Sequence, residues 1–240
     1  MHRINVWSSP RNISTAFMYA FAQRRDTTVF DEPLYAHYLT KTTTAATHPG
    51  TAEILQSQEQ DGEKVVENII LGDHSTAIVL FKQMTHHLIH LQEDFLFQTQ
   101  NILLIRDPRR IIASYAKVIP NPTIHDIGIQ KQYELFQKLQ KGDHTAAVID
   151  AQQLLMNPAK VLTRLCQNLS IPFDENMLSW KPGPRPEDGV WAKYWYANVH
   201  QSTGFQAYEE RAIDLPANLE FLARECLDYY EFLWQYAIKA

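Results

Sequence analysis

The sequence predicts a single α/β domain with a central, mainly parallel sheet of about five strands, flanked by helices in a three-layer arrangement. Short, almost wholly apolar runs alternate with stretches of helical periodicity along the 240 residues, which is typical of this fold class. These runs do not alternate polar and apolar residues, as expected for parallel strands that are covered on both faces. The expected strands are Ile4–Trp7, Thr27–Phe30, Ala77–Phe81, Asn101–Ile105 and Ala146–Ile149.

Composition limits the kinds of partner. Hydrophobic residues make up 45% of the chain, enough for one substantial core, and the formal net charge of −5 argues against general binding of nucleic acid or anionic membranes. Cys166 and Cys226 lie in apolar helical patterns, so we expect buried free thiols. With no signal peptide and no run of membrane-spanning length, we expect a cytoplasmic protein. The oligomeric state stays open, a homodimer being one alternative.

The first expected strand leads through a turn into a helix. Ser8–Asn12 combines small polar residues with a proline, which is typical of a turn. The first N–H groups of a helix lack intrahelical partners, and the helix dipole adds partial positive charge, so this segment predicts an anion site. Arg11, Ser14 and Thr15 are placed to complete it. The apolar face of the helix consists of Ile13, Ala16, Phe17, Ala20 and Phe21.

This turn differs from the common phosphate-binding loops. It lacks the Gly-Lys-Ser/Thr of a Walker A loop and contains no glycine, so its backbone is less able to wrap around a triphosphate. Arg11 must therefore supply much of the charge, and its planar guanidinium suits the paired oxygens of a phosphate or sulfate. The alternative is that Arg11 is an ordinary surface residue near the end of a strand.

A second anion site is predicted after the strand Asn101–Ile105. Arg106 follows the strand directly, at the edge where parallel sheets bind ligands. Asp107 is a suitable N-cap and Pro108 a suitable first residue for the next helix, on which Ser114 lies two turns along. The alternative is an ordinary capped helix with a charged start. Its polar side carries Arg110, Ser114 and Lys117, and its apolar side Ile111, Ile112, Tyr115 and Val118.

Between these segments, Pro33 ends the strand Thr27–Phe30 and favours an extended backbone at Glu32. Residues 36–72 are rich in Thr, Gln and His and only weakly periodic. We interpret them as short helices that form a cap over the sheet, the alternative being a loose surface insertion. Later helices are expected from about Ile127 to Lys141, over Asn157–Asn168, and at the C-terminus, with an inward face of Leu219, Leu222, Ala223, Cys226, Tyr230 and Leu233.

Several motifs in order resemble the sulfotransferases that use 3′-phosphoadenosine 5′-phosphosulfate (PAPS), especially the carbohydrate branch. Ser8–Thr15 resembles the loop for the 5′-phosphosulfate, and Arg106-Asp107-Pro108 with Ser114 resembles the 3′-phosphate motif. Asp31-Glu32-Pro33-Leu34 resembles the Glu-Pro-Leu/Val that follows the second strand in that branch. The resemblance continues through Met156-Asn157-Pro158, Leu162, Leu165-Cys166, Leu169–Phe173 and Gly189-Val190-Trp191, and misses mainly residues 36–72.

The chain also departs from the family pattern. Ile13 stands where the loop glycine is expected, so the backbone must avoid positive φ there. Ser170 replaces another glycine. The Lys-x-His that carries the base in cytosolic members reads Lys82-Gln83-Met84, with His86 and His87 just beyond it.

The resemblance implies a P-loop NTPase-like fold and transfer of a sulfuryl group from PAPS to a hydroxyl or amino group of a small acceptor, leaving adenosine 3′,5′-bisphosphate. It assigns Arg106 and Ser114 to the 3′-phosphate, with Lys181 or Arg185 as additional contacts. It also implies that Arg11 neutralises the charge that develops on the leaving phosphate. The predicted phosphosulfate contacts are Ser9, Pro10, Arg11, Asn12, Ile13, Ser14 and Thr15.

Glu32 is the first candidate for the base that accepts the proton of the acceptor, and a raised pKa would suit it to that role near neutrality. His86 or His87 is the second candidate. The alternative for Glu32 is a turn residue that pairs with a lysine. We expect no metal site, because the spacing of His86 and His90 is not accompanied by further ligands.

Two other classes of protein stay open. One is a P-loop-like small-molecule kinase, and the other is a nucleotide-binding relative without transfer activity. The aromatic group Trp191, Tyr194, Trp195 and Tyr196 either stacks on adenine or an acceptor ring, or fixes its segment to the core.

Overall fold

The structure, a computed structural model, describes residues 1–42, 48–119, 121–210 and 212–240. Five strands form one sheet in the order β2-β3-β1-β4-β5, and every neighbouring pair is parallel. The predicted fold class is therefore confirmed, and each strand lies within a few residues of its expected place. The strands are β1 (His2–Ser8), β2 (Thr27–Asp31), β3 (Ile78–Met84), β4 (Gln100–Ile105) and β5 (Ala147–Asp150).

The strand order decides where the carboxyl ends of the strands meet. β1 lies between β3 and β4, so the chain builds one half of the sheet with β2 and β3 and the other half with β4 and β5. The end of β1 is thus a point where the strand order reverses, and α/β sheets bind ligands at such points. The turn after β1 and the start of α1 (Ser14–Ala22) occupy this position.

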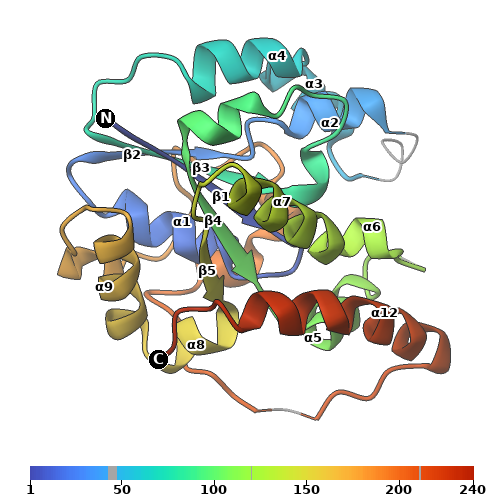
Figure 1. Cartoon of the computed structure of the whole chain (residues 1–240). Helices are drawn as coiled ribbons and strands as arrows, with labels where there is room; N and C mark the ends of the chain where they lie inside the picture. The colour runs from blue at the N-terminus through green and yellow to red at the C-terminus, as the bar shows by residue number, and fades with distance from the viewer. Residues whose placement is uncertain (43–47, 120, 211) are drawn as a thin grey trace.

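Two apolar clusters cover the two faces of the sheet and make the three layers. α1, α9 (Pro158–Asn168) and the 3-10 turn η5 (Glu175–Leu178) pack on one face. The other face is covered by α5 (Pro108–Tyr115), α7 (Ile129–Lys141) and α12 (Ala217–Trp234). Figure 1 shows α7 crossing in front of the sheet with α1 behind it.

The helix α1 is buried more completely than one apolar face would require. Phe17, Met18, Tyr19, Ala20 and Phe21 are all without exposed surface. The side opposite the predicted apolar face is covered by the η5 turn and by the residues that follow it, where the ring of Trp180 lies 6.1 Å from that of Tyr19.

The capping predicted for α5 is confirmed. The Asp107 carboxylate accepts a hydrogen bond from the Arg109 N–H over 2.8 Å, and Pro108 is the first helical residue. The helix ends at Tyr115, so Val118 does not belong to its apolar side and is 46% exposed, which makes that expectation wrong. The next helix begins two residues later than expected because Gly128 has a φ of 75° and separates α6 (Ile124–Ile127) from α7.

The C-terminal third follows the predicted pattern. The Asn157 side chain caps α9, and the short helix α8 (Ala151–Met156) precedes it. Cys166 and Cys226 are buried free thiols, as expected. Ser170 takes a left-handed φ of 57°, the conformation for which glycine is usually selected. α10 (Ala192–Trp195) and α11 (Ala197–His200) lie in the irregular segment before α12.

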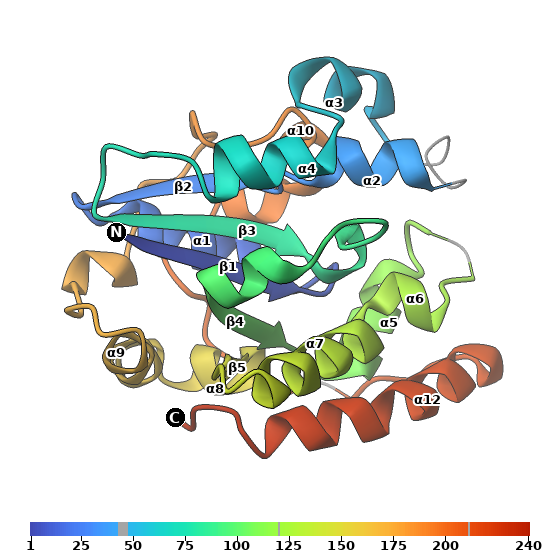
Figure 2. The same ribbon diagram turned by 45° about the horizontal axis from the view of Figure 1, so that its top comes forward.

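Short helices occupy the segment that follows β2. They are α2 (Tyr35–Lys41), α3 (Thr51–Ser57), α4 (Gly62–Val65) and the π-turn η2 (Val66–Ile70). Figure 2 shows α2, α3 and α4 beside β2, at the opposite end of the sheet from α12. Tyr35, Tyr38 and Ile54 form an apolar cluster with Trp191 and Tyr196. The role of this segment as a cap stays a prediction.

Two more 3-10 turns, η3 (Thr85–His87) and η4 (Asp94–Gln98), lie between β3 and β4. Among the helices of the described ranges, none has the length and apolar character needed to cross a membrane.

Candidate active site

A cavity of about 620 Å³ opens at the carboxyl edge of the sheet. Its walls bring together the turn after β1, the first residues of α1, the end of β2 and the start of α5. Eleven of the residues predicted for the site line it: Pro10, Arg11, Asn12, Ile13, Ser14, Thr15, Arg106, Ser114 and, toward β2, Glu32 with the histidine pair His86 and His87. These side chains come from segments far apart in the sequence, so the sheet edge is what assembles them.

The turn after β1 holds a definite shape without glycine. Ile13 has a φ of −94°, so the backbone avoids positive φ there as expected, and Arg11 takes the left-handed conformation with a φ of 54°. The Asn12 amide donates to the Leu104 carbonyl over 2.9 Å, and its oxygen accepts from the Ile13 N–H over 2.8 Å. A buried glutamine of α7, Gln132, donates to the Trp7 carbonyl over 2.8 Å. Side-chain amides therefore stabilise this turn.

The two predicted anion groups are in direct contact. Nε of Arg11 donates to Oγ of Ser114 over 3.0 Å, and Nη1 of Arg106 donates to the carbonyl oxygen of Arg11 over 2.7 Å. Burial lowers the pKa of Arg106, and the nearby positive charges of Arg110 and Arg11 lower it further. In the described ranges neither Arg11 nor Arg106 forms an ion pair with a carboxylate. This cation pair fits a ligand that brings its own negative charge.

The N-terminus of α1 faces the same cavity. The first backbone bond of the helix runs from the Phe17 N–H to the Ile13 carbonyl over 2.9 Å, so the N–H groups of Ser14 and Thr15 precede it. Ser14 and Thr15 both line the cavity. Ser9 does not, because it is fully buried and its hydroxyl donates to Gln132 over 3.3 Å.

Glu32 is a buried carboxylate on an unusual backbone. Its φ is 46°, so the expectation of an extended conformation before Pro33 is wrong. Tertiary hydrogen bonds account for the difference. The Glu32 N–H donates to the Lys82 carbonyl over 2.8 Å, while its own carbonyl accepts from the Tyr35 N–H over 3.0 Å and from the Gln58 amide over 3.1 Å. Such strained residues are frequent at functional sites.

The Glu32 side chain pairs with a lysine of β3, as the alternative interpretation anticipated, and also lines the cavity. Nζ of Lys82 donates to Oε1 of Glu32 over 2.5 Å, to Oδ1 of Asp31 over 2.7 Å and to the Tyr196 hydroxyl over 2.6 Å. Burial raises the pKa of Glu32, against the lowering effect of Lys82. For Lys82, burial lowers the pKa, but the charges of Asp31 and Glu32 outweigh it and hold the pKa well above its usual range.

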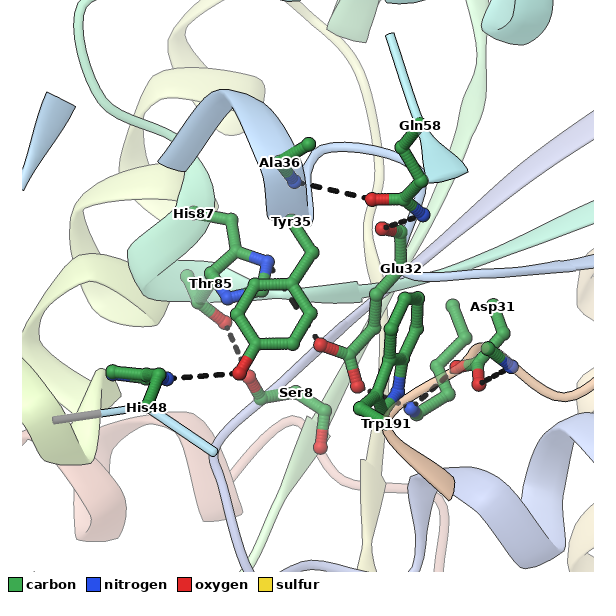
Figure 3. Close-up of polar contacts among 12 residues, drawn as sticks. Ser8, Asp31, Glu32, Tyr35, Ala36, His48, Gln58, Thr85, His87 and Trp191 are labelled. Atoms are coloured by element: carbon green, nitrogen blue, oxygen red, sulfur yellow. Dashed lines mark hydrogen bonds and ion pairs between the residues drawn. The ribbon is translucent and has the colours of Figure 1, made fainter. Parts of the chain in front are cut away.

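The histidine pair lies beside this carboxylate. Nδ1 of His87 is 3.9 Å from Oε2 of Glu32, and the His87 ring is stacked between the rings of Tyr35 and Tyr38 at 4.7 and 4.6 Å. Burial lowers the pKa of His86 to about 3 and that of His87 well below its usual range. Both rings are therefore neutral near pH 7. Figure 3 shows the side chains of Tyr35, His87 and Trp191 around the Glu32 carboxylate.

Two predicted donor contacts lie elsewhere. Lys181 and Arg185 do not line the cavity and instead border a smaller depression beside Gln23. The guanidinium of Arg185 lies 4.5 Å from the centre of the Tyr19 ring, on the outer side of α1.

Three of the four residues of the aromatic group line the cavity. Trp191 and Tyr196 are buried in the cavity wall and Trp195 also lines it, whereas Tyr194 is 44% exposed and does not line it.

Sequence reasoning missed Lys82 and Asp31 as members of the site. A signal existed, because Lys82 is a charged residue within the apolar run of β3. Its meaning depends on the pairing of β2 with β3, which places Asp31 opposite Lys82 in the register. That pairing is not visible in the sequence.

Comparisons with known proteins agree with this geometry. A family model described as a sulfotransferase domain matches residues 2–235. Two curated proteins of Arabidopsis thaliana, the branched-chain-amino-acid aminotransferase-like proteins 2 and 1, are 38% and 39% identical to the chain over 97% and 96% of its length. The chain spans 41% of the length of each of these relatives.

Several solved structures of similar shape are sulfotransferases. The sulfotransferase domain from the Synechococcus PCC 7002 olefin synthase has a TM-score of 0.56 and 18% identity, covering 94% of both chains. Mouse sulfotransferase SULT7A1 complexed with PAP has a TM-score of 0.53 and 10% identity, covering 98% of this chain and 83% of that one. At sequence identities of 18% and 10%, these structures show a similarity of fold alone.

Proposed function

The chain belongs to the sulfotransferase domain family, and from that membership we propose that it is an enzyme that transfers a sulfuryl group from PAPS to a hydroxyl or amino group of a small acceptor. One observation carries the proposal: a single cavity contains a pair of guanidinium groups without carboxylate partners in the described ranges and, toward β2, a buried carboxylate. β3 and β1 separate β2 from β4, so the strands that precede Glu32 and Arg106 are three strand spacings apart, roughly 14 Å. Donor and acceptor therefore have separate places along the edge.

The donor is assigned to the Arg11 and Arg106 side of the cavity. Arg11, the free N–H groups of α1 and the hydroxyls of Ser14 and Thr15 hold the phosphosulfate. Arg106 and Ser114 hold the 3′-phosphate. Lys181 and Arg185, which border another depression, remain candidates for an additional contact only if their segment moves. The contact between Arg11 and Ser114 supports one continuous binding surface for both anionic groups.

Glu32 is assigned as the base. In the transfer step a lone pair of the acceptor oxygen or nitrogen forms a bond to sulfur while the bond from sulfur to the bridging phosphate oxygen breaks. The electron pair of that bond goes to the phosphate oxygen, where Arg11 offsets the new charge, and the proton of the acceptor goes to Glu32. His86 and His87 are weaker candidates because burial depresses the pKa of each ring.

The acceptor side of the cavity is lined by neutral rings. The Tyr35 hydroxyl is hydrogen-bonded to His48 over 2.8 Å, and the Trp191 N–H donates to the Tyr196 hydroxyl over 3.2 Å. Because these polar atoms already have partners, a ligand meets mainly ring faces. This wall favours a small, flat and uncharged acceptor over one that carries a carboxylate or phosphate.

Within a single domain of residues 1–240, the segment 36–72 is assigned as the cap. It contributes His48 to the wall of the cavity, and its Gln58 holds both the Glu32 carbonyl and the Ala36 N–H. A displacement of this segment would therefore shift both His48 in the acceptor wall and the Gln58 amide that holds the Glu32 backbone.

Calorimetry with adenosine 3′,5′-bisphosphate and with ATP in the presence of magnesium tests the donor. We expect the bisphosphate to bind more tightly, and tighter binding of ATP would favour a small-molecule kinase instead. Transfer of radiolabelled sulfate from PAPS to a panel of phenols, alcohols and amines tests the enzyme. Binding of the bisphosphate without transfer to any acceptor would indicate a nucleotide-binding relative.

A further inference from the structure

Lys82 connects Glu32 to a second carboxylate, and we infer that Asp31 acts through Lys82 as a positioning residue for Glu32. Asp31 shares the ammonium group and so prevents Lys82 from neutralising Glu32 completely, which leaves that carboxylate able to accept a proton. The inference rests on the proposed function of Glu32 as the base. It assigns a role to a pair of residues that the motifs of the chain do not explain.

The ammonium group of Lys82 has a partner for each of its N–H donors. An ammonium has three N–H donors, and those of Lys82 have three acceptors within 2.7 Å: Asp31, Glu32 and the Tyr196 hydroxyl. Its side chain is 2% exposed. In this arrangement no N–H of Lys82 remains for a ligand, so Lys82 acts on the other members of the cluster.

The two carboxylates differ in how many of their oxygens are hydrogen-bonded. Both oxygens of Asp31 are fixed, since Oδ2 accepts from the Gly189 N–H over 3.0 Å and the Tyr196 hydroxyl lies 2.9 and 2.8 Å from the two oxygens. Glu32 has a hydrogen bond to Oε1 alone among the described residues, and its Oε2 lies 3.9 Å from the nearest histidine nitrogen. These hydrogen bonds hold Asp31 in place on both oxygens, whereas Glu32 keeps an oxygen for a proton.

The charges around Glu32 come from neighbouring elements. The groups that face Glu32 are Lys82 from β3, Asp31 from β2, His87 from η3, Tyr35 from α2 and Tyr196 from the segment after α10. His87 and the two tyrosines contribute no charge near neutrality, since burial keeps His87 neutral and raises the pKa of both tyrosines. Burial and the charge of Asp31 raise the pKa of Glu32, while Lys82 lowers it. The balance of two fixed charges therefore sets how strongly Glu32 holds a proton.

The register of the sheet makes this balance possible. Asp31 is the residue of β2 that pairs with Lys82 of β3. Glu32 follows it in a left-handed conformation with a φ of 46°, which brings two consecutive carboxylates to one ammonium. In an extended strand, consecutive side chains point to opposite faces. The unusual backbone of Glu32 is thus part of the arrangement.

Opposite charge changes test the inference. Asp31→Asn leaves the full charge of Lys82 on Glu32, so the midpoint at which Glu32 deprotonates falls by about one pH unit. Lys82→Met removes the cation and raises that midpoint by about the same amount or more. The double variant returns it toward the wild-type value. The midpoint is measured as the acidic limb of the pH profile of kcat/KM, and also by NMR titration of carboxyl-labelled glutamate with Glu32→Gln as the assignment control.

Controls separate this effect from loss of structure. Asp188→Asn changes a neighbouring aspartate that bonds to Tyr19 and His200 and has no contact with Lys82, so it leaves the midpoint within a few tenths of a unit. Lys82→Arg keeps the positive charge and shifts the midpoint less than Lys82→Met. If Asp31→Asn does not fold, Asp31→Ser removes the same carboxylate and is measured in its place.

The outcomes are distinct. Shifts of Asp31→Asn and Lys82→Met in the same direction, or no shift in either, would overturn the inference. Should the wild type transfer no sulfate, the proposed function fails, yet the NMR midpoints still show whether Asp31 controls Glu32 through Lys82.

Discussion

Arg11 and Ser114 are 103 positions apart in the sequence, and a hydrogen bond of 3.0 Å joins Nε of Arg11 to Oγ of Ser114. One residue belongs to the turn after β1 and the other to α5 after β4. Because β1 and β4 are neighbours in the sheet, their following segments meet at one edge. This contact fixes the guanidinium of Arg11 at the mouth of the donor site.

Ser114→Ala removes that contact and also a proposed donor ligand. We expect the affinity for adenosine 3′,5′-bisphosphate to fall by about 1 to 2 kcal/mol, since a hydrogen bond to a charged group is lost. Calorimetry measures the change. Ser57→Ala is the matched control, because Ser57 is an exposed serine of α3 outside the cavity, and it should leave the affinity unchanged. Equal affinities for the Ser114 variant and the wild type would count against the donor assignment.

Glu32→Gln tests the base. The variant keeps an oxygen for Lys82 but cannot accept a proton, so transfer should fall by about 100-fold or more. Binding of the bisphosphate should stay close to that of the wild type, because Glu32 lies toward β2, away from Arg106. Turnover that survives this substitution would show that another group is the base.

Gln58→Ala tests the link between the cap and the base. The amide of Gln58 donates to the Glu32 carbonyl, and its oxygen accepts from the Ala36 N–H over 3.1 Å. Its loss relaxes a strained turn, so kcat should fall several-fold while KM for PAPS changes little, and stability should fall by about 1 kcal/mol. Gln60→Ala is the control, because Gln60 is exposed and its amide donates to the Leu55 carbonyl of its own segment. A fall in kcat that is equal in both variants would contradict the link.

The buried histidines predict how stability depends on pH. His86 has a pKa of about 3 in the folded protein because burial disfavours its charged form, whereas an unfolded histidine has a pKa of about 6.5. Below about pH 6.5 the unfolded chain therefore binds more protons, and stability falls as pH falls until the folded pKa is reached.

His86→Gln should remove about 2 kcal/mol of the difference in unfolding free energy between about pH 7.5 and pH 5, since each unit of pH below 6.5 costs about 1.4 kcal/mol for one such group. Urea unfolding at the two pH values measures it. His200→Gln is the control. Because His200 is only half-buried, we expect its replacement to change the pH dependence of the unfolding free energy less than His86→Gln does. An unchanged pH dependence in His86→Gln would mean that the ring is not held neutral.

Local rules gave the elements that carry the site. The apolar run of β1, the turn at Ser8–Asn12 and the cap at Asp107 each follow from neighbours within a few residues, so the sequence was enough to place Arg11 and Arg106 at strand ends. The same rules failed where tertiary hydrogen bonds compete with local preference. Glu32 departs from the extended conformation favoured before proline because the Lys82 carbonyl and the Gln58 amide hold its backbone.

The sequence by itself determined an α/β fold, two anion-binding segments and a carboxylate after the second strand, because apolar periodicity, turn residues and caps act over short distances. The tertiary structure decided that β3 lies beside β2 and that Lys82 is shared by Asp31 and Glu32. Strand neighbours depend on how the whole sheet buries its faces, and a buried charge is tolerated only where its partners arrive from other segments. The lysine could therefore be seen in the sequence, but its partners could not.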